Sequence, residues 1–169
     1  MARLLLEDTR QQAGKHEFKH AWWRAAGIGI IRSKLPFGDY CLPPAAAVDT
    51  KASIAELAYD IDQDHERFRR ELVGARDAGI ALTVLVENDE GVSCLDDLAA
   101  WRESGESFAR RRFAQRRHDG ARLAKACATM AERYGCAFLF CAPDESARVI
   151  CEILGGGFDG AGDAGSCGG

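Results

Sequence analysis

The most informative stretch of this 169-residue chain is Leu35-Pro36-Phe37-Gly38-Asp39-Tyr40, together with the Asp49-Thr50-Lys51 that follows it. The segment between the two motifs is apolar and is broken by Pro43-Pro44. Proline is excluded from central strands, so this pattern predicts a β-hairpin whose loop is residues 43–45. With that loop, Leu42 pairs with Ala46.

The predicted register brings two carboxylates and a lysine together. Asp39 falls opposite Asp49, and Lys51 lies on the same face as Asp49 because side chains alternate along a strand. Two like charges directly opposite each other destabilise a sheet unless something neutralises them. Carboxylate oxygens are ligands that Mg²⁺ prefers, with Mn²⁺ as a substitute. The hairpin therefore predicts a divalent cation site.

The composition excludes several classes of protein. A hydrophobic fraction of 47% with 28% charged residues is ordinary for one globular domain and too apolar for a disordered chain. No apolar run reaches membrane-spanning length, and Met1 to Leu6 is too short for a signal peptide. The seven cysteines include no CxxC pair, which favours reduced thiols in a cytoplasmic protein without a membrane partner.

Hydrophobic periodicity predicts an α/β fold with a mixed central sheet flanked by helices. Strands are expected at 3–8, 28–33, 80–87 and 136–141 beside the hairpin of 38–51, and helices at 16–26, 54–78, 95–101, 120–134 and 146–154. The long helix after Ser53, the N-cap of a capping box with Glu56, has an apolar stripe that is interrupted near 60–64. Residues 1–155 are expected to form the domain, and the glycine-rich residues 156–169 a flexible tail.

These residues also resemble those of XPF/Hef-type nuclease domains. Glu7-Asp8-Thr9-Arg10 is similar to the first motif of that family, Gly38-Asp39 to its GD motif, and Asp49-Thr50-Lys51 to its glutamate-arginine-lysine motif. Over residues 3–155 the chain is most similar to small phage and prophage proteins that contain this domain alone. Two departures are that Asp49 replaces a glutamate and that Ala55 stands where the family has a further aspartate.

The resemblance implies a restriction-endonuclease-like three-layer fold and Mg²⁺-dependent cleavage of branched, flap or fork DNA in replication, recombination, repair or packaging. By position it implies that Asp8, Asp39 and Asp49 are metal ligands. It implies that Lys51 is the catalytic lysine and that Arg10 contacts phosphate.

Basic residues outside these motifs are candidate DNA contacts, because guanidinium and ammonium groups bind phosphates. The candidates are Lys15, Lys19, Arg67, Arg110, Arg111, Arg112, Arg116, Arg117 and Lys125. The run from 110 to 117 could equally be a solvated connector. His16 and His20 have a spacing that can bind zinc, but no adjacent glutamate completes the HExxH motif.

Several alternatives stay open at this level. Arg67 could reach the active face or pair with Glu71, and Glu87 could support the site or end its strand in solvent. His65 lies on the apolar stripe and is expected to be packed. The leading hypothesis is a metal-dependent DNA endonuclease. A homodimer is a candidate oligomeric state. Its alternatives are a non-catalytic DNA-binding or dimerisation subunit and a sequence-specific restriction enzyme.

Overall fold

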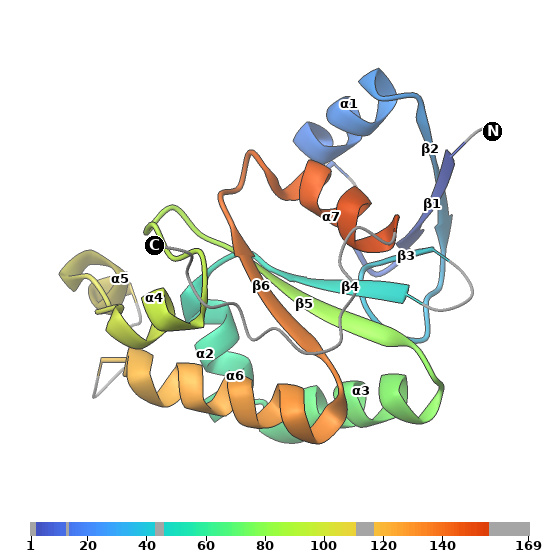
Figure 1. Ribbon diagram of the computed structural model, residues 1–169. Helices are drawn as coiled ribbons and strands as arrows, with labels where there is room; N and C mark the ends of the chain where they lie inside the picture. Colours follow the sequence, from blue (N-terminus) through green and yellow to red (C-terminus); the bar gives the residue numbers. More distant parts are fainter. Residues whose placement is uncertain (1–2, 13, 43–45, 111–116, 156–169) are drawn as a thin grey trace.

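A computed structural model describes residues 3–12, 14–42, 46–110 and 117–155 (Figure 1). Its strands are β1 Arg3–Asp8, β2 Ile28–Ser33, β3 Tyr40–Leu42, β4 Ala46–Lys51, β5 Ala81–Glu87 and β6 Ala137–Cys141. Its helices are α1 Glu17–Ala25, α2 Ile54–Asp62, α3 His65–Asp77, α4 Leu95–Ala100, α5 Gly105–Arg110, α6 Gly120–Tyr134 and α7 Ser146–Leu154. The predicted tail lies outside the described residues.

The six strands form one mixed sheet in the order β2-β1-β3-β4-β5-β6. The short strand β3 is antiparallel to both neighbours, and the remaining pairs are parallel. Helices α1 and α7 cover one face, and α2, α3 and α6 cover the other (Figure 1). The predicted α/β fold with three layers is therefore confirmed.

The hairpin has the predicted register, with Leu42 opposite Ala46 and Tyr40 opposite Val48. Pairing stops at Tyr40, so Asp39 lies just before the strand. Its backbone N–H donates to the carbonyl of Val48 (2.7 Å), and its carbonyl accepts from the N–H of Asp8 (2.8 Å). Gly38 has a φ of +69°, and a Cβ there would lie 2.8 Å from the Val48 carbonyl oxygen. Only glycine fits this turn, which fixes Asp39 between β1 and β4.

The predicted interruption of the long helix is real, since α2 ends at Asp62 and α3 begins at His65. The capping box is also confirmed: the Ser53 hydroxyl accepts from the Glu56 N–H at 3.1 Å. The expectation that His65 is packed is wrong, because half of its side chain is exposed. As the first residue of α3, it precedes the turns that pack on the sheet.

Two hydrophobic cores lie on opposite faces of the sheet. The core under α2, α3 and α6 contains Phe68 and Leu72, and the core under α1 and α7 contains Trp23 and Tyr40. Strand β5 contributes to both, because Val84 and Val86 face the first core and Leu85 the second. This explains why its sequence is a continuous apolar run.

The cysteines follow the prediction only in part. Cys136 and Cys141 are buried as expected, and Cys41, Cys127, Cys136, Cys141 and Cys151 are free thiols. Cys94 is disulfide-bonded, which contradicts the expectation of reduced thiols throughout. Within the described part of the chain, no helix combines the length and the apolar character needed to cross a bilayer.

Gly120 supplies a test of the packing between α4 and α6. A Cβ at this position would lie 2.3 Å from the carbonyl oxygen of Leu98 and 2.5 Å from that of Trp101. We expect Gly120→Ala to lower the free energy of unfolding by about 1–3 kcal/mol through overpacking. Urea denaturation followed by circular dichroism measures the change. Gly105→Ala is the matched control, because its Cβ would meet only Arg117 at an ordinary 3.6 Å. Equal stability of the two variants would contradict the packing described.

Candidate active site

The sheet brings the acidic motifs together at one edge. Asp8 ends β1, Asp39 precedes β3, and Asp49 and Lys51 lie near the end of β4. Asp49 and Lys51 point to the same face, as predicted, because the Lys51 ammonium nitrogen lies 2.8 Å from Asp49 Oδ2. That face is the one covered by α2 and α3, since the Lys51 nitrogen also lies 5.0 Å from the ring centre of Phe68.

Lys51 is buried with only 3% of its surface exposed, and it has two carboxylate partners. Besides Asp49, its ammonium contacts Asp60 Oδ2 of α2 at 2.5 Å. Burial alone would lower the pKa of Lys51, but the charges of Asp49 and Asp60 outweigh burial and raise it. Lys51 is therefore a cation at neutral pH, held on the apolar face of Phe68.

Asp60 connects the lysine to the helices. Its Oδ1 accepts a hydrogen bond from the guanidinium of Arg67 at 2.9 Å, and Arg67 also pairs with Asp64. The same guanidinium lies 3.8 Å from Glu71, whose carboxylate accepts the backbone N–H of Gly38 at 3.1 Å. A continuous chain of polar contacts thus runs from the Gly38 turn through α3 and α2 to Lys51. Both alternatives for Arg67 hold: it pairs with Glu71 and it supports the active face.

The pKa of Asp49 is raised to about 7. Burial is the largest cause, and the carboxylates of Glu71 and Asp39 add to it, whereas Lys51 opposes it. The strand ladder ends at Tyr40, so Asp39 is not a strand partner of Asp49, but it contacts the residues on either side of Asp49. Its backbone N–H donates to the carbonyl of Val48, and its Oδ2 accepts from the N–H (2.9 Å) and hydroxyl (2.6 Å) of Thr50.

Asp8 is fully engaged by Arg10. Its Oδ1 accepts the Arg10 backbone N–H at 2.8 Å, and its Oδ2 accepts the Arg10 Nε–H at 2.8 Å. Burial alone would raise the pKa of Asp8, but the Arg10 contacts outweigh it and lower the pKa. The side chain of Arg10 is 62% exposed, so the pair lies at the mouth of the site.

The three predicted metal ligands do not form a preassembled cluster. Among the described residues, no group of three His, Cys, Asp or Glu side chains is arranged to hold a metal ion. Asp39 and Asp49 nevertheless each keep Oδ1 without a hydrogen bond from the described residues, and Asp49 Oδ2 has Lys51 nearby without a well-directed hydrogen bond. Asp39 and Asp49 therefore fit a divalent cation, whereas Asp8 would first have to leave Arg10.

A second charged cluster lies on the opposite face, under α1. His20 contacts Glu7 at 2.9 Å, and Lys19 is ion-paired with Glu87 at the end of β5. Lys19 is only 4% exposed, so the prediction that it contacts DNA is corrected: its ammonium neutralises the partly buried carboxylate of Glu87. Glu87 is not a solvated strand end, because only 13% of its side chain is exposed and its carboxylate is paired with Lys19.

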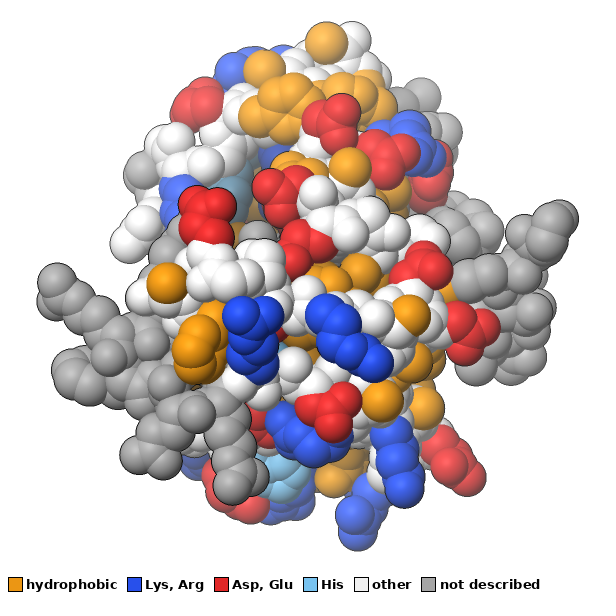
Figure 2. Space-filling model, turned by 90° about the vertical axis from the view of Figure 1, so that its left-hand side faces the viewer, with side chains coloured by type: hydrophobic (Ala, Val, Ile, Leu, Met, Phe, Trp, Pro, Cys, Tyr) orange, Lys and Arg blue, Asp and Glu red, His pale blue; other side chains and the backbone are white. Residues whose placement is uncertain are grey.

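The other predicted DNA contacts are spread over the molecule. Lys15 is exposed before α1, and Arg117 donates to the Glu103 carbonyl at 2.9 Å. Arg110 ends α5, and Arg111, Arg112 and Arg116 lie outside the described residues. Figure 2 shows Lys and Arg side chains gathered mainly on the lower half of one face, with Asp and Glu side chains across its middle.

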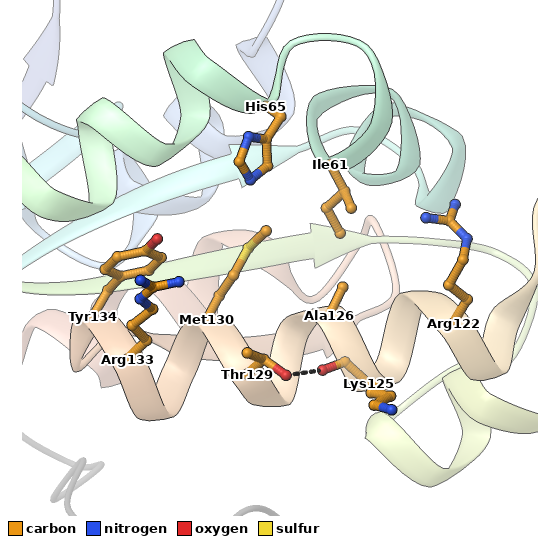
Figure 3. A pocket seen from close by; sticks show the side chains of 9 residues that line it. All are labelled: Ile61, His65, Arg122, Lys125, Ala126, Thr129, Met130, Arg133 and Tyr134. Carbon is orange, nitrogen blue, oxygen red and sulfur yellow. Dashed lines mark hydrogen bonds between the residues drawn. The ribbon is translucent and has the colours of Figure 1, made fainter.

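Lys125 lines a pocket of about 370 Å³ between α6 and the α2–α3 junction. Figure 3 shows its lining residues, Ile61, His65, Arg122, Lys125, Ala126, Thr129, Met130, Arg133 and Tyr134. Side chains from the two sides point toward one another over an apolar base, with cations at the rim. Arg122 is paired with Asp62 at 2.6 Å, whereas Lys125 and Arg133 have no carboxylate partner in the described part of the chain. The pocket is an electropositive surface next to the helix that carries Asp60.

Sequence reasoning missed the roles of Asp60 and Glu7, and for Glu71 it offered only the pairing with Arg67. Asp60 lies three residues after the buried Leu57, so the helical period places it at the edge of the apolar stripe. That position was a detectable signal of a buried carboxylate, but its lysine partner is in another element. The contact of Glu71 with Gly38 and the contacts of Glu7 carried no signal, because these partners are distant in sequence.

Comparison with known proteins identifies the class of fold. The chain resembles the solved structure of XPF from Aeropyrum pernix with a TM-score of 0.62 and 18% identity, over 89% of this chain and 63% of that one. It resembles XPF from Aeropyrum pernix in complex with DNA with a TM-score of 0.63 and 18% identity, over 92% and 64%. The chain thus spans somewhat less than two thirds of these proteins.

The chain therefore shares its fold with XPF from Aeropyrum pernix, as the motifs implied. No family model matches the sequence, and no curated protein matches it.

Asp60 and Asp62 provide a matched pair for testing the polar chain, since both are in α2 and both pair with an arginine. Asp60 is buried and its removal leaves Lys51 with one partner, so Asp60→Ala should cost about 3–5 kcal/mol of unfolding free energy. The Asp62–Arg122 pair is partly exposed, so Asp62→Ala should cost under about 1 kcal/mol. Chemical denaturation measures both, and equal losses would contradict the role assigned to Asp60.

The raised pKa of Asp49 predicts a pH dependence of stability. The folded protein binds the Asp49 proton more tightly than the unfolded chain does, so this group stabilises the fold at low pH. That contribution is lost as the pH rises from about 4 to about 7. Asp49→Asn removes the titration, so its stability relative to wild type should increase over this range. Urea denaturation in EDTA at pH 4.5 and 7.5 measures the difference, and a constant difference would contradict the raised pKa.

Proposed function

We propose that this protein is a metal-dependent DNA endonuclease that cleaves branched, flap or fork DNA. The observation that carries the proposal is the buried Lys51 cation beside Asp49, with Asp39 next to them at the edge of the sheet. The similarity of the fold to XPF from Aeropyrum pernix, one structure of which is a complex with DNA, supports it.

Mg²⁺, with Mn²⁺ as a substitute, is the cofactor we propose, and Asp39 and Asp49 would hold it through their free oxygens. Asp8 would become a third ligand once its carboxylate released the guanidinium of Arg10 and bound the cation instead. When bound, the ion would supply Lewis-acid stabilisation of a phosphate and activation of water. The approach of a cation would also favour the ionised form of Asp49, whose pKa is raised without one.

Lys51 would stabilise the negative charge that develops on the scissile phosphate. Its position is fixed before substrate binds, because Asp60 and Phe68 hold it from the helix side. Arg10, exposed at the mouth of the site, would turn from Asp8 to a phosphate oxygen. Lys15, Arg67, Arg117 and Lys125 are proposed DNA contacts, as are the arginines 110, 111, 112 and 116.

A second candidate function is a non-catalytic DNA-binding or dimerisation subunit, with a homodimer as its proposed assembly. The observation in its favour is that Asp8 is held by Arg10 and that no three-ligand metal cluster is preassembled among the residues described. The intact Asp39, Asp49 and Lys51 favour the enzyme.

Cleavage of flap, fork and plain duplex DNA tests the proposal. We expect cutting of the branched substrates with Mg²⁺ and none in EDTA. Lys51→Met and Asp49→Ala should each lower the rate about 10²–10³-fold, because each removes charge stabilisation at the reacting phosphate. Asp62→Asn, on the opposite side of α2, is the control and should keep the wild-type rate. Binding of forked DNA without metal-dependent cutting would support the second function, and a discrete fragment pattern on duplex DNA would indicate a restriction enzyme.

A further inference from the structure

A pocket on the α1 side of the sheet has no role in the site described so far. Its volume is about 340 Å³, and its lining is Lys15, His16, Phe18, Lys19, Glu87, Pro143 and Asp144. It lies between the start of α1, the end of β5 and the loop after β6. Two of its lining residues, the buried Lys19 and the partly buried Glu87, form an ion pair.

Phe18 is the unusual residue of this pocket. It is in α1, whose inward face buries Trp23, yet 56% of its own surface is exposed. Pro143, also exposed, adds a second apolar surface to the lining. Phe18 and Pro143 together give the pocket an exposed apolar surface that the flat face of a ligand can cover.

The pocket adjoins the candidate active site through the sheet. Glu87 directly follows Val86, which pairs with Lys51 in the ladder of β4 and β5. Side chains alternate between faces, so Glu87 reaches the α1 side while Lys51 reaches the α2 side. Asp49, Lys51 and Glu87 all lie near the carboxyl ends of the parallel strands β4 and β5, so the two sites share one edge of the sheet.

We propose that this pocket binds one unpaired nucleotide of a DNA strand whose neighbouring phosphate lies in the active site. The inference rests on the proposed nuclease function and specifies the substrate as DNA with a single-stranded segment beside the cut.

The chemistry of the lining selects a nucleotide over a bare anion. Lys15 has no carboxylate partner among the described residues and can bind a phosphate, but Asp144 offsets its charge. The remaining surface, Phe18 and Pro143, suits the face of a base, since aromatic side chains stack on bases of any sequence. Asp144 can accept a hydrogen bond from an amino group of adenine, cytosine or guanine. The base would contact Phe18 and Pro143, the phosphate would contact Lys15, and the amino group would contact Asp144.

The experiment uses a single-stranded oligonucleotide containing 2-aminopurine, whose fluorescence falls when the base stacks. Titration of the full chain in EDTA at fixed salt measures binding without cleavage. We expect quenching by the wild type, and about tenfold weaker binding with loss of quenching in Phe18→Ala. Phe18→Trp should restore both. Circular dichroism melting of each variant confirms that it is folded, which is expected because Phe18 is exposed.

Tyr59→Ala is the matched control, because Tyr59 is also a helical aromatic residue with 56% of its surface exposed and lies outside this pocket. It should bind and quench like the wild type. Equal binding and quenching by wild type and Phe18→Ala, or an equal loss in Tyr59→Ala, would overturn the pocket proposal while leaving the nuclease function standing. Failure of the wild type to bind any DNA, single-stranded, forked or duplex, would overturn the proposed function itself.

Discussion

The ammonium group of Lys51 is the point at which the sheet, two helices and the acidic motifs meet. A buried cation is costly unless it is paired, and Lys51 has the carboxylates of Asp49 and Asp60 within 2.8 Å and 2.5 Å. The first carboxylate comes from its own strand and the second from α2. The requirement to neutralise one charge thus fixes where α2 lies on the sheet. Through Arg67 and Glu71 the same requirement reaches the Gly38 turn.

This arrangement separates the two faces of the sheet in character. On the α2 and α3 side, Asp49 and Lys51 form a reactive cluster with carboxylate oxygens left free. On the α1 side, Arg32 is ion-paired with Glu7 and Lys19 with Glu87, and His20 contacts Glu7, so these groups serve a structural purpose. Because side chains alternate along a strand, Glu7 and Asp8 of β1 point to opposite faces of the sheet, as do Val86 and Glu87 of β5. One sheet edge can therefore hold a candidate catalytic centre and a separate nucleotide pocket.

Much of the fold was predictable because its signals are local. The prolines after Leu42 set the hairpin loop and hence the register, which the structure confirms from Tyr40 to Leu42. The hydroxyl of Ser53 starts α2 as predicted. The prediction for Lys19 was wrong because its partner Glu87 is 68 residues away in sequence. The prediction that His65 is packed was wrong because the long helix breaks before it. In a continuous helix His65 would lie on the apolar stripe.

The hairpin, the order of the strands and the place of Asp39, Asp49 and Lys51 at one edge follow from the sequence alone, because turn chemistry and side-chain alternation act over a few residues. Which charges are paired depends on the packed fold. Asp60 pairs with Lys51, Arg10 pairs with Asp8, and Thr50 binds one carboxylate oxygen of Asp39. These outcomes depend on which groups are buried together, and burial is a property of the packed chain. Asp39 and Asp49, which the sequence predicts as an opposed pair, are thus neighbours with different partners.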